Sequence, residues 1–192
     1  IAESIAAALE LQAHAHEAAA FVDVVVSCSF GSPFDDVTGV GDVVPLVDAL
    51  RTACPGARLT LADTTGTATP RRIEAVLRGL GAGDSLDDSL DDLGLHLHDT
   101  RGTALANAMW AFEHGVQRFD AATAGLGGSP FAPGAGGNLA TEQLVMTLED
   151  QGVSTGVELD ALLAISGRLG DLVGHELPSR VAAAGGLPSF EP

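Results

Sequence analysis

Short apolar runs alternate with longer amphipathic segments along most of this 192-residue chain. The short runs predict β-strands, and the segments between them have the spacing of apolar residues that is typical of helices. Such alternation predicts parallel strands joined by right-handed crossovers, which defines the α/β class. The strands are expected at 21–27, 58–62, 93–98 and 118–123, and the helices at 2–20, 41–53, 70–80, 103–114, 138–150, 158–172 and 179–184.

Polar side chains gather where the predicted strands end, and (β/α)8 barrels carry their active sites at this end of their strands. The sequence indicates only four strands, whereas a complete barrel has eight strands and about 250 residues. Four units alone would leave open sheet edges and an uncovered apolar interior. We therefore predict a single partial TIM barrel over residues 1–192, with about four βα units and additional carboxyl-terminal helices. This domain is expected to be the carboxyl-terminal half of a barrel, without its amino-terminal strands.

The charge balance limits the partners of the chain. The formal net charge is −17, and all nine basic residues are arginines. Nucleic-acid backbones and anionic membranes would repel such a chain. No apolar run approaches the ~18 residues that span a bilayer, and no basic segment marks a signal peptide. Two cysteines without a CxxC motif fit a reducing compartment, so we predict a bacterial cytoplasmic protein with neither nucleic acid nor membrane as partner.

Two histidines one residue apart, His96 and His98, stand at the end of the third predicted strand. Alternate residues of a strand face the same side, so the two imidazoles should converge. Converging imidazoles indicate a divalent metal site, and two packed core histidines are the alternative. His14 and His16 have the same spacing on a predicted helix, where they point about 200° apart and cannot converge.

Three other residues stand near the ends of predicted strands or of the glycine-rich segment, namely Asn138, Asp63 and Cys28. Asn138 could supply an amide oxygen to the metal, or it could cap the helix that follows it. Imidazole and oxygen ligands without a thiolate suit Mg²⁺ or Mn²⁺. Asp63 follows the second predicted strand, where it could exchange protons with a substrate or bond its own backbone in a turn. Cys28 is expected to be a small buried apolar residue.

Glycines dominate the segment 125–137, which begins with Gly125, Gly127 and Gly128. No helix starts directly at these glycines, so the segment is not a dinucleotide-binding fingerprint. A loop so rich in glycine and proline is predicted to close over a substrate. Ser129 in this loop has no Asp/His relay in the sequence, which argues against a serine hydrolase. The acidic run at 84–92 predicts a solvated loop.

These motifs together resemble the 3-hydroxy-3-methylglutaryl-CoA lyase family, which belongs to a superfamily of metal-dependent TIM-barrel lyases and synthases. The resemblance rests on Asp63-Thr64-Thr65-Gly66, on His96-Leu97-His98-Asp99-Thr100, and on Ala124–Phe131 followed by Gly137–Glu142. It implies cleavage of 3-hydroxy-3-methylglutaryl-CoA to acetyl-CoA and acetoacetate, as in leucine degradation.

The resemblance also implies roles for individual residues. His96, His98 and Asn138 would bind Mg²⁺ or Mn²⁺, and Asp63 and Ser129 would be catalytic. Gly125, Gly127 and Gly128 would belong to the substrate loop. The implied partners are an acyl-CoA substrate and a second copy of the chain in a homodimer.

Two features depart from the family pattern. The family's loop normally carries a catalytic cysteine where this chain has Ser129, and a hydroxyl is far harder to ionise than a thiol. The family's first strand supplies an Arg-Glu/Asp motif with a metal-ligating aspartate, and this chain contains no such segment. We therefore expect the isolated chain to be weakly active or inactive. Two alternatives are a sister lyase that acts on a related branched 3-hydroxyacyl-CoA and a non-catalytic truncated remnant.

Overall fold

The computed structural model describes residues 1–18, 20–34, 38–81, 90, 92–128 and 136–188. Over these residues the backbone forms one sheet of four parallel strands in the order β1-β2-β3-β4. The strands are β1 Asp23–Val26, β2 Arg58–Ala62, β3 Leu93–His96 and β4 Phe119–Asp120. The predicted α/β alternation with parallel strands is therefore confirmed.

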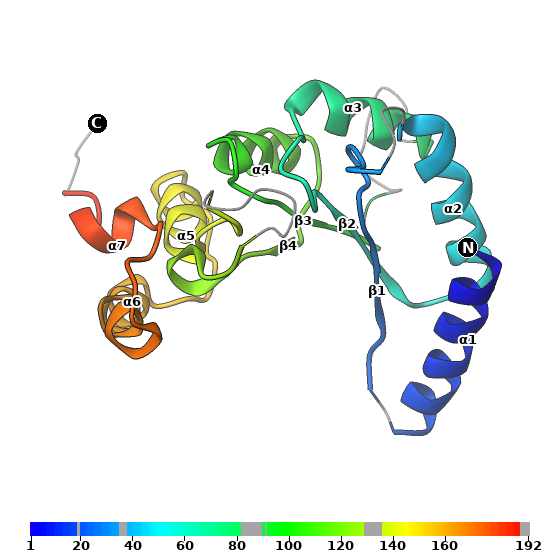
Figure 1. The fold of residues 1–192 in the computed structure, drawn as a ribbon, viewed down its shortest axis with the longest axis horizontal. Coiled ribbons are helices and arrows are strands. Elements are labelled where there is room, and N and C mark those ends of the chain that lie inside the picture. The colour runs from blue at the N-terminus through cyan, green and yellow to red at the C-terminus, as the bar shows by residue number, and fades with distance from the viewer. Residues whose placement is uncertain (19, 35–37, 82–89, 91, 129–135, 189–192) are drawn as a thin grey trace.

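The helices lie along the outer, convex side of the curved sheet (Figure 1). They are α1 Ala2–Glu17, α2 Val40–Ala53, α3 Pro70–Gly79, α4 Ala104–Glu113, α5 Thr141–Asp150, α6 Leu159–Val173 and α7 Arg180–Ala184, with a short 3-10 turn, η1, at Thr123–Gly125. Local sequence explains where α3 begins, because Pro70 loses nothing by lacking an N–H in the first turn. The Thr69 hydroxyl accepts a hydrogen bond from the Arg72 N–H at the same end. At the far end of the arc α6 and α7 pack against α5.

Alternating side chains decide which face of the sheet the helices cover. Leu59 and Leu61 of β2 are at most 1% exposed and share the apolar core with Ile73 of α3. Because successive strand residues face opposite sides, Thr60 of β2 and His96 of β3 point to the concave side. Burial of the leucine face thus fixes the direction of the first candidate ligand.

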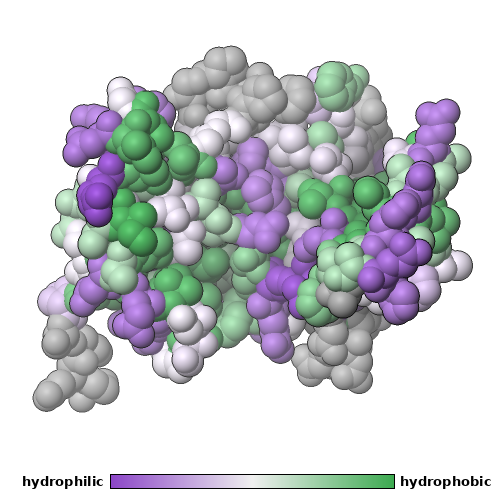
Figure 2. Space-filling view, turned by 90° about the horizontal axis from the view of Figure 1, so that it is seen from below, coloured by the Kyte–Doolittle hydropathy of each residue, from purple (hydrophilic) through white to green (hydrophobic). Residues whose placement is uncertain are grey.

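The concave side carries a polar cluster near the amino-terminal ends of the strands. The Arg118 guanidinium donates to the Asp23 carboxylate, and the Thr60 hydroxyl donates to the other Asp23 oxygen at 2.8 Å. Arg118 also donates to the Leu59 carbonyl at 2.7 Å and lies over Gly94, where a Cβ would meet the guanidinium at 3.0 Å. Figure 2 views the concave side and shows polar residues running across its middle between apolar patches.

Some predicted elements are shorter in the structure, and the hydrogen bonds explain why. β4 has only two residues, because Ala122 pairs with Ala140 in an isolated bridge beyond its end. The helix predicted from 138 begins instead at Thr141. Its expected first turn is extended, since the Leu139 N–H donates to the Leu97 carbonyl at 3.0 Å.

The acidic run at 84–92 lies outside the described residues except for Leu90 and Asp92. Asp92 accepts two hydrogen bonds from the Arg51 guanidinium, both at 2.8 Å, so this end of the run is held by an ion pair. Within the described ranges, no helix combines the length and the apolar surface that a bilayer crossing requires.

Candidate metal centre

The two histidines converge at the carboxyl-terminal end of the sheet. Their ring centroids lie 5.1 Å apart, with the ring planes inclined by 65°. β3 ends at His96, so the prediction that the strand continues to His98 is wrong. His98 nevertheless remains extended, because it pairs with Asn138 in an isolated antiparallel bridge. Extended backbone on both sides of Leu97 keeps the two imidazoles on the same side.

The environment of His98 favours a neutral imidazole. Burial lowers the pKa of His98, the neighbouring His96 lowers it further, and a hydrogen bond with the Thr64 backbone acts in the opposite direction. Its Nδ1 is buried and has no hydrogen-bond partner among the described residues. A buried neutral imidazole with an unused ring nitrogen is chemically suited to bind a metal ion.

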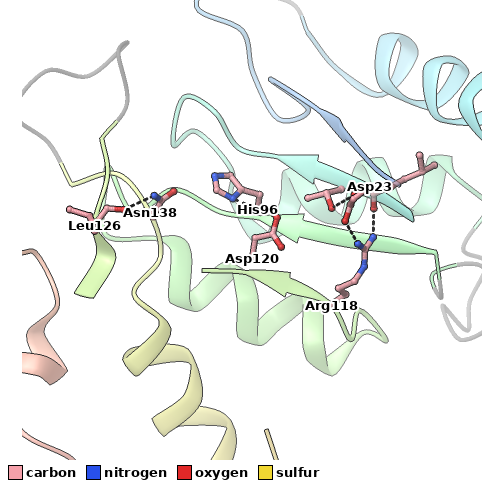
Figure 3. Close-up of polar contacts among 8 residues, drawn as sticks. Asp23, His96, Arg118, Asp120, Leu126 and Asn138 are labelled. Carbon is pink, nitrogen blue, oxygen red and sulfur yellow. Dashed lines mark hydrogen bonds and ion pairs between the residues drawn. The ribbon is translucent and has the colours of Figure 1, made fainter. Parts of the chain in front are cut away.

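His96 lies at the edge of the concave side, next to an acidic residue of β4. Its side chain is 29% exposed, and its Nδ1 lies 3.9 Å from the Asp120 carboxylate (Figure 3). This distance is too long for a hydrogen bond, so Asp120 acts on the ring through its charge. The carboxylate adds negative potential at the rim, which favours a cation there.

Backbone and side-chain hydrogen bonds together position Asn138. The Asp99 N–H donates to the Gly137 carbonyl at 2.6 Å, which fixes the segment before Asn138 against the end of β3. The Asn138 Nδ2 donates to the Leu126 carbonyl at 2.7 Å. Figure 3 shows the amide oxygen on the side that faces His96. The alternative that Asn138 caps a helix is wrong, because the residue before α5 is Ala140.

Asp63 follows β2 directly and lies beside β3, where its N–H donates to the His96 carbonyl at 2.8 Å. The residue is 1% exposed. Its Oδ1 accepts the N–H groups of Thr67 and Ala68 at 2.8 and 3.0 Å, so the predicted turn-forming role is present. Its Oδ2 is buried and has no hydrogen-bond partner in the described part of the chain.

Burial also shifts the pKa of this carboxyl. Desolvation raises the pKa of Asp63, while the backbone hydrogen bonds from Thr67 and Ala68 and the charges of Arg101 and Arg72 lower it. A buried carboxyl with one committed and one unpaired oxygen can exchange a proton with a bound molecule. One oxygen of this side chain thus shapes the loop, and the other is unpaired among the described residues.

The glycines of the predicted substrate loop differ in what their backbone requires. Gly127 has a φ of 118°, and a Cβ at this position would lie 2.5 Å from the Asn138 Nδ2. Gly125 has a φ of 68° and lies against Pro178. Gly128 is not in the left-handed region, and a Cβ there would meet nothing within 4 Å among the described atoms. Ser129 lies outside the described residues.

The orphaned His98 Nδ1 is a nitrogen donor without a partner among the described residues. No group of three or more His, Cys, Asp or Glu side chains in the described ranges is placed to hold a metal ion. The candidate ligands proposed from the sequence differ from such a group, because they are two imidazoles and the amide oxygen of Asn138. Imidazole and amide oxygen are both accepted ligands of Mg²⁺ or Mn²⁺, so the residues present are chemically compatible with either ion.

Two features near the site differ from the sequence-based expectation or were not found from the sequence. Cys28 is partly exposed, with φ of 58°, and its N–H donates to the Thr64 hydroxyl at 2.9 Å, so the prediction of a buried apolar role is wrong. The signal available was its position after β1, which matches that of Asp63 after β2. The Leu126 carbonyl that orients Asn138 is a backbone group, and no side-chain pattern indicates it.

Comparisons with known proteins show the family of the chain. Residues 1–168 match the HMGL-like family model. The hydroxymethylglutaryl-CoA lyase YngG of Bacillus subtilis is 40% identical over 155 residues, covering 81% of this chain and 50% of the relative. The (R)-citramalyl-CoA lyase of Chloroflexus aurantiacus is 40% identical over 164 residues, covering 84% of this chain and 50% of the relative.

Similarity also extends to solved structures. An HMG-CoA lyase from Acinetobacter baumannii, in complex with coenzyme A and 3-methylmalate, has a TM-score of 0.83 and 38% identity, covering 100% of this chain and 61% of that chain. Such lyases are TIM barrels, so the predicted TIM-barrel fold class is confirmed. The chain spans about half the length of the curated relatives it matches. Its assignment to the carboxyl-terminal half of a barrel stays a prediction. Because the family model matches most of its residues, the chain belongs to the HMGL-like family of lyases.

Proposed function

We propose that this chain forms part of a metal-dependent lyase that cleaves 3-hydroxy-3-methylglutaryl-CoA to acetyl-CoA and acetoacetate. The observation that supports the proposal is the approach of the His96 and His98 rings to 5.1 Å, with His98 paired to Asn138 and the buried Asp63 bonded to the His96 backbone. A site that binds a cation next to a proton acceptor is what cleavage of a 3-hydroxyacyl thioester requires.

His96, His98 and Asn138 would hold Mg²⁺ or Mn²⁺ in this proposal. When bound, the cation supplies Lewis acidity to the oxygens of the substrate. The neutral state of His98, favoured by its lowered pKa, leaves an imidazole lone pair available for this purpose. The Asn138 Nδ2 donates to the Leu126 carbonyl, which leaves the amide oxygen without a hydrogen-bond partner among the described residues.

Asp63 is assigned the proton transfer. Its unpaired Oδ2 would take the proton of the tertiary hydroxyl, and the electron pair left on that oxygen would form the ketone of acetoacetate as the carbon–carbon bond breaks. The other product leaves as the acetyl-CoA enolate, which then takes up a proton. The two backbone hydrogen bonds to Oδ1 hold the carboxyl in one orientation during this transfer. Ser129 could donate a hydrogen bond to an oxygen of the substrate.

The test measures metal binding and turnover separately. Mn²⁺ binding to the 192-residue chain is followed by electron paramagnetic resonance, with His98→Ala and Asp63→Asn as variants and His14→Ala as a matched control on α1. We expect His98→Ala alone to weaken binding by about 10-fold or more. Equal Mn²⁺ binding by His98→Ala and His14→Ala would contradict the metal centre. Turnover of 3-hydroxy-3-methylglutaryl-CoA by the isolated chain is expected to be weak or absent, and ordinary lyase rates would refute that expectation.

A lyase for a different branched acyl-CoA is the second candidate. It is favoured by the equal identity of the (R)-citramalyl-CoA lyase and by the complex of a solved relative with coenzyme A and 3-methylmalate. Both candidate reactions use a hydroxyl next to the bond that breaks, so the metal centre and Asp63 serve either one. Comparing kcat/KM for the two CoA thioesters on a catalytically active protein that contains this chain would decide between them.

A non-catalytic truncated remnant is the remaining alternative. The DNA upstream of the Ile1 codon separates it from an enzyme. A continuous reading frame that encodes an Asp-Arg-Glu-like motif favours the enzyme, whereas a stop codon favours the remnant. The homodimer, leucine degradation as the pathway and the cytoplasmic location stay predictions.

A further inference from the structure

A glutamate without exposed surface lies in the first turn of α5. Glu142 is 0% exposed, although carboxylates are almost never fully buried without partners. In the described part of the chain its hydrogen-bond partners are three neutral donors. A glutamate at a helix start ordinarily interacts with the helix dipole at the surface. The burial of Glu142 therefore calls for a different explanation.

The three donors come from segments that are distant in the sequence. The Ala124 N–H donates to Oε1 of Glu142 at 2.7 Å, and the Ser166 hydroxyl of α6 donates to the same oxygen. The Ser179 hydroxyl at the start of α7 donates to Oε2 at 3.4 Å. One carboxylate thus joins η1 to the two carboxyl-terminal helices.

Ala124 is the member of this cluster that needs support. It has a φ of 56°, in the left-handed region that a residue with a Cβ rarely adopts. Such a backbone persists only where its surroundings hold it. Both polar groups of Ala124 are held, because its N–H donates to Glu142 and its carbonyl accepts the Ser179 N–H at 3.2 Å.

The turn that Ala124 makes leads directly to the candidate metal centre. Two residues later the Leu126 carbonyl accepts the hydrogen bond from the Asn138 Nδ2 at 2.7 Å, as Figure 3 shows. Gly127 lies so close to the same amide that a Cβ would come within 2.5 Å of it. The position of residues 124–127 therefore determines the orientation of the Asn138 side chain.

We propose that Glu142 is a positioning residue that holds the Ala124 turn and, through the Leu126 carbonyl, aims the Asn138 amide oxygen at the two imidazoles. The step from the Asn138 amide oxygen to the two imidazoles rests on the proposed function, whereas the contact between Glu142 and Ala124 does not. Glu142 itself touches neither metal nor substrate in this proposal.

Three variants of the 192-residue chain test the two links. Glu142→Ala removes the acceptor of the Ala124 N–H, and Glu142→Gln keeps an oxygen at the same place without the charge. Glu149→Ala is the matched control, because Glu149 is an exposed residue on the same helix. Hydrogen–deuterium exchange resolved to the Ala124 amide measures the first link, and Mn²⁺ titration followed by electron paramagnetic resonance measures the second.

We expect Glu142→Ala to lower the protection of the Ala124 amide by about tenfold or more. We expect the same variant to raise the Mn²⁺ dissociation constant by about 10–100-fold, as loss of an indirect support of a metal ligand typically does. Glu142→Gln should stay within about threefold of the unaltered chain in both measurements, and Glu149→Ala should match the unaltered chain.

Unchanged protection of the Ala124 amide in Glu142→Ala would overturn the first link. Lost protection with an unchanged Mn²⁺ dissociation constant would overturn the second. Equal losses in Glu142→Gln and Glu142→Ala would show that charge, not the acceptor position, matters, and would also overturn the proposal. If the unaltered chain binds Mn²⁺ no better than His98→Ala, the proposed function fails, and amide exchange alone then decides whether Glu142 holds the turn.

Discussion

Gly127→Ala tests most directly how the backbone of the glycine loop fixes the candidate metal centre. In the structure Gly127 has a φ of 118°, and a Cβ there would lie 2.5 Å from the Asn138 Nδ2. Ordinary contacts begin near ~3.5 Å, so the amide or the loop must move by about 1 Å. The new residue must also tolerate a backbone conformation that costs about 1–3 kcal/mol without glycine.

Two measurable effects follow from this displacement. The free energy of unfolding should fall by about 1–3 kcal/mol, as measured by urea denaturation. The dissociation constant for Mn²⁺ should rise by about 10–100-fold, because a ligand oxygen leaves its place while the imidazoles stay. In an active protein that contains this chain, a misplacement of about 1 Å would lower kcat/KM by roughly 100-fold.

Gly128→Ala is the matched control for this variant. A Cβ at Gly128 would meet nothing within 4 Å among the described atoms, and its backbone is not left-handed. The control should bind Mn²⁺ like the unaltered chain. Equal affinity in Gly127→Ala and Gly128→Ala would refute the reasoning, because it would mean that the Asn138 amide does not depend on the loop beside it.

Three further changes test the carboxyl, the core and the loop. Asp63→Asn should remove one pH dependence of the free energy of unfolding. Burial raises the pKa of Asp63 above 3.8, so the unaltered chain loses stability as the pH rises from 3.8 through that raised value. If the urea midpoints of the variant and of the unaltered chain change with pH in the same way between pH 4 and 7, this reasoning is contradicted. Leu61→Ala leaves a cavity at a position that is 0% exposed and should lower the free energy of unfolding by about 2–5 kcal/mol. Its control, Leu172→Ala, changes a residue that is 81% exposed and should alter that free energy by less than about 0.5 kcal/mol. Ser129→Cys should raise kcat for 3-hydroxy-3-methylglutaryl-CoA in an active protein that contains this chain, because a thiol ionises far more readily than a hydroxyl. An unchanged kcat would show that acid–base chemistry at this position is not limiting.

The sheet was predictable because each strand has a simple physical signature. Leu59 and Leu61 alternate with residues that face the other side, and burial of the leucines against the helices sets the direction of the whole strand. The same alternation brought His96 and His98 together, even though His98 lies beyond the end of β3. Local periodicity therefore sufficed for the sheet and for the convergence of the paired imidazoles.

The contacts that orient the site were not predictable from local patterns. Glu142 is separated from Ala124 by 18 residues, and a glutamate at a helix start ordinarily indicates only a favourable dipole interaction. The Leu126 carbonyl and the left-handed backbone of Ala124 are properties of the main chain, on which the side-chain sequence gives no signal. Asn138 could be named as a candidate ligand, but the reason for its orientation required the folded chain.

The bridge between His98 and Asn138 fixes which residue of this segment pairs with the second histidine. Asp99 and Leu97 bond the backbone on either side of Asn138, so the spacing of these residues is locked within the ladder. The register of Asn138 in this ladder is set by the two backbone hydrogen bonds that flank it. A shift of one residue after Gly136 would instead replace the asparagine with Gly137 or Leu139, neither of which has a side-chain oxygen. The number of residues between Gly136 and Leu139 therefore admits almost no change, because the ladder fixes which residue pairs with His98.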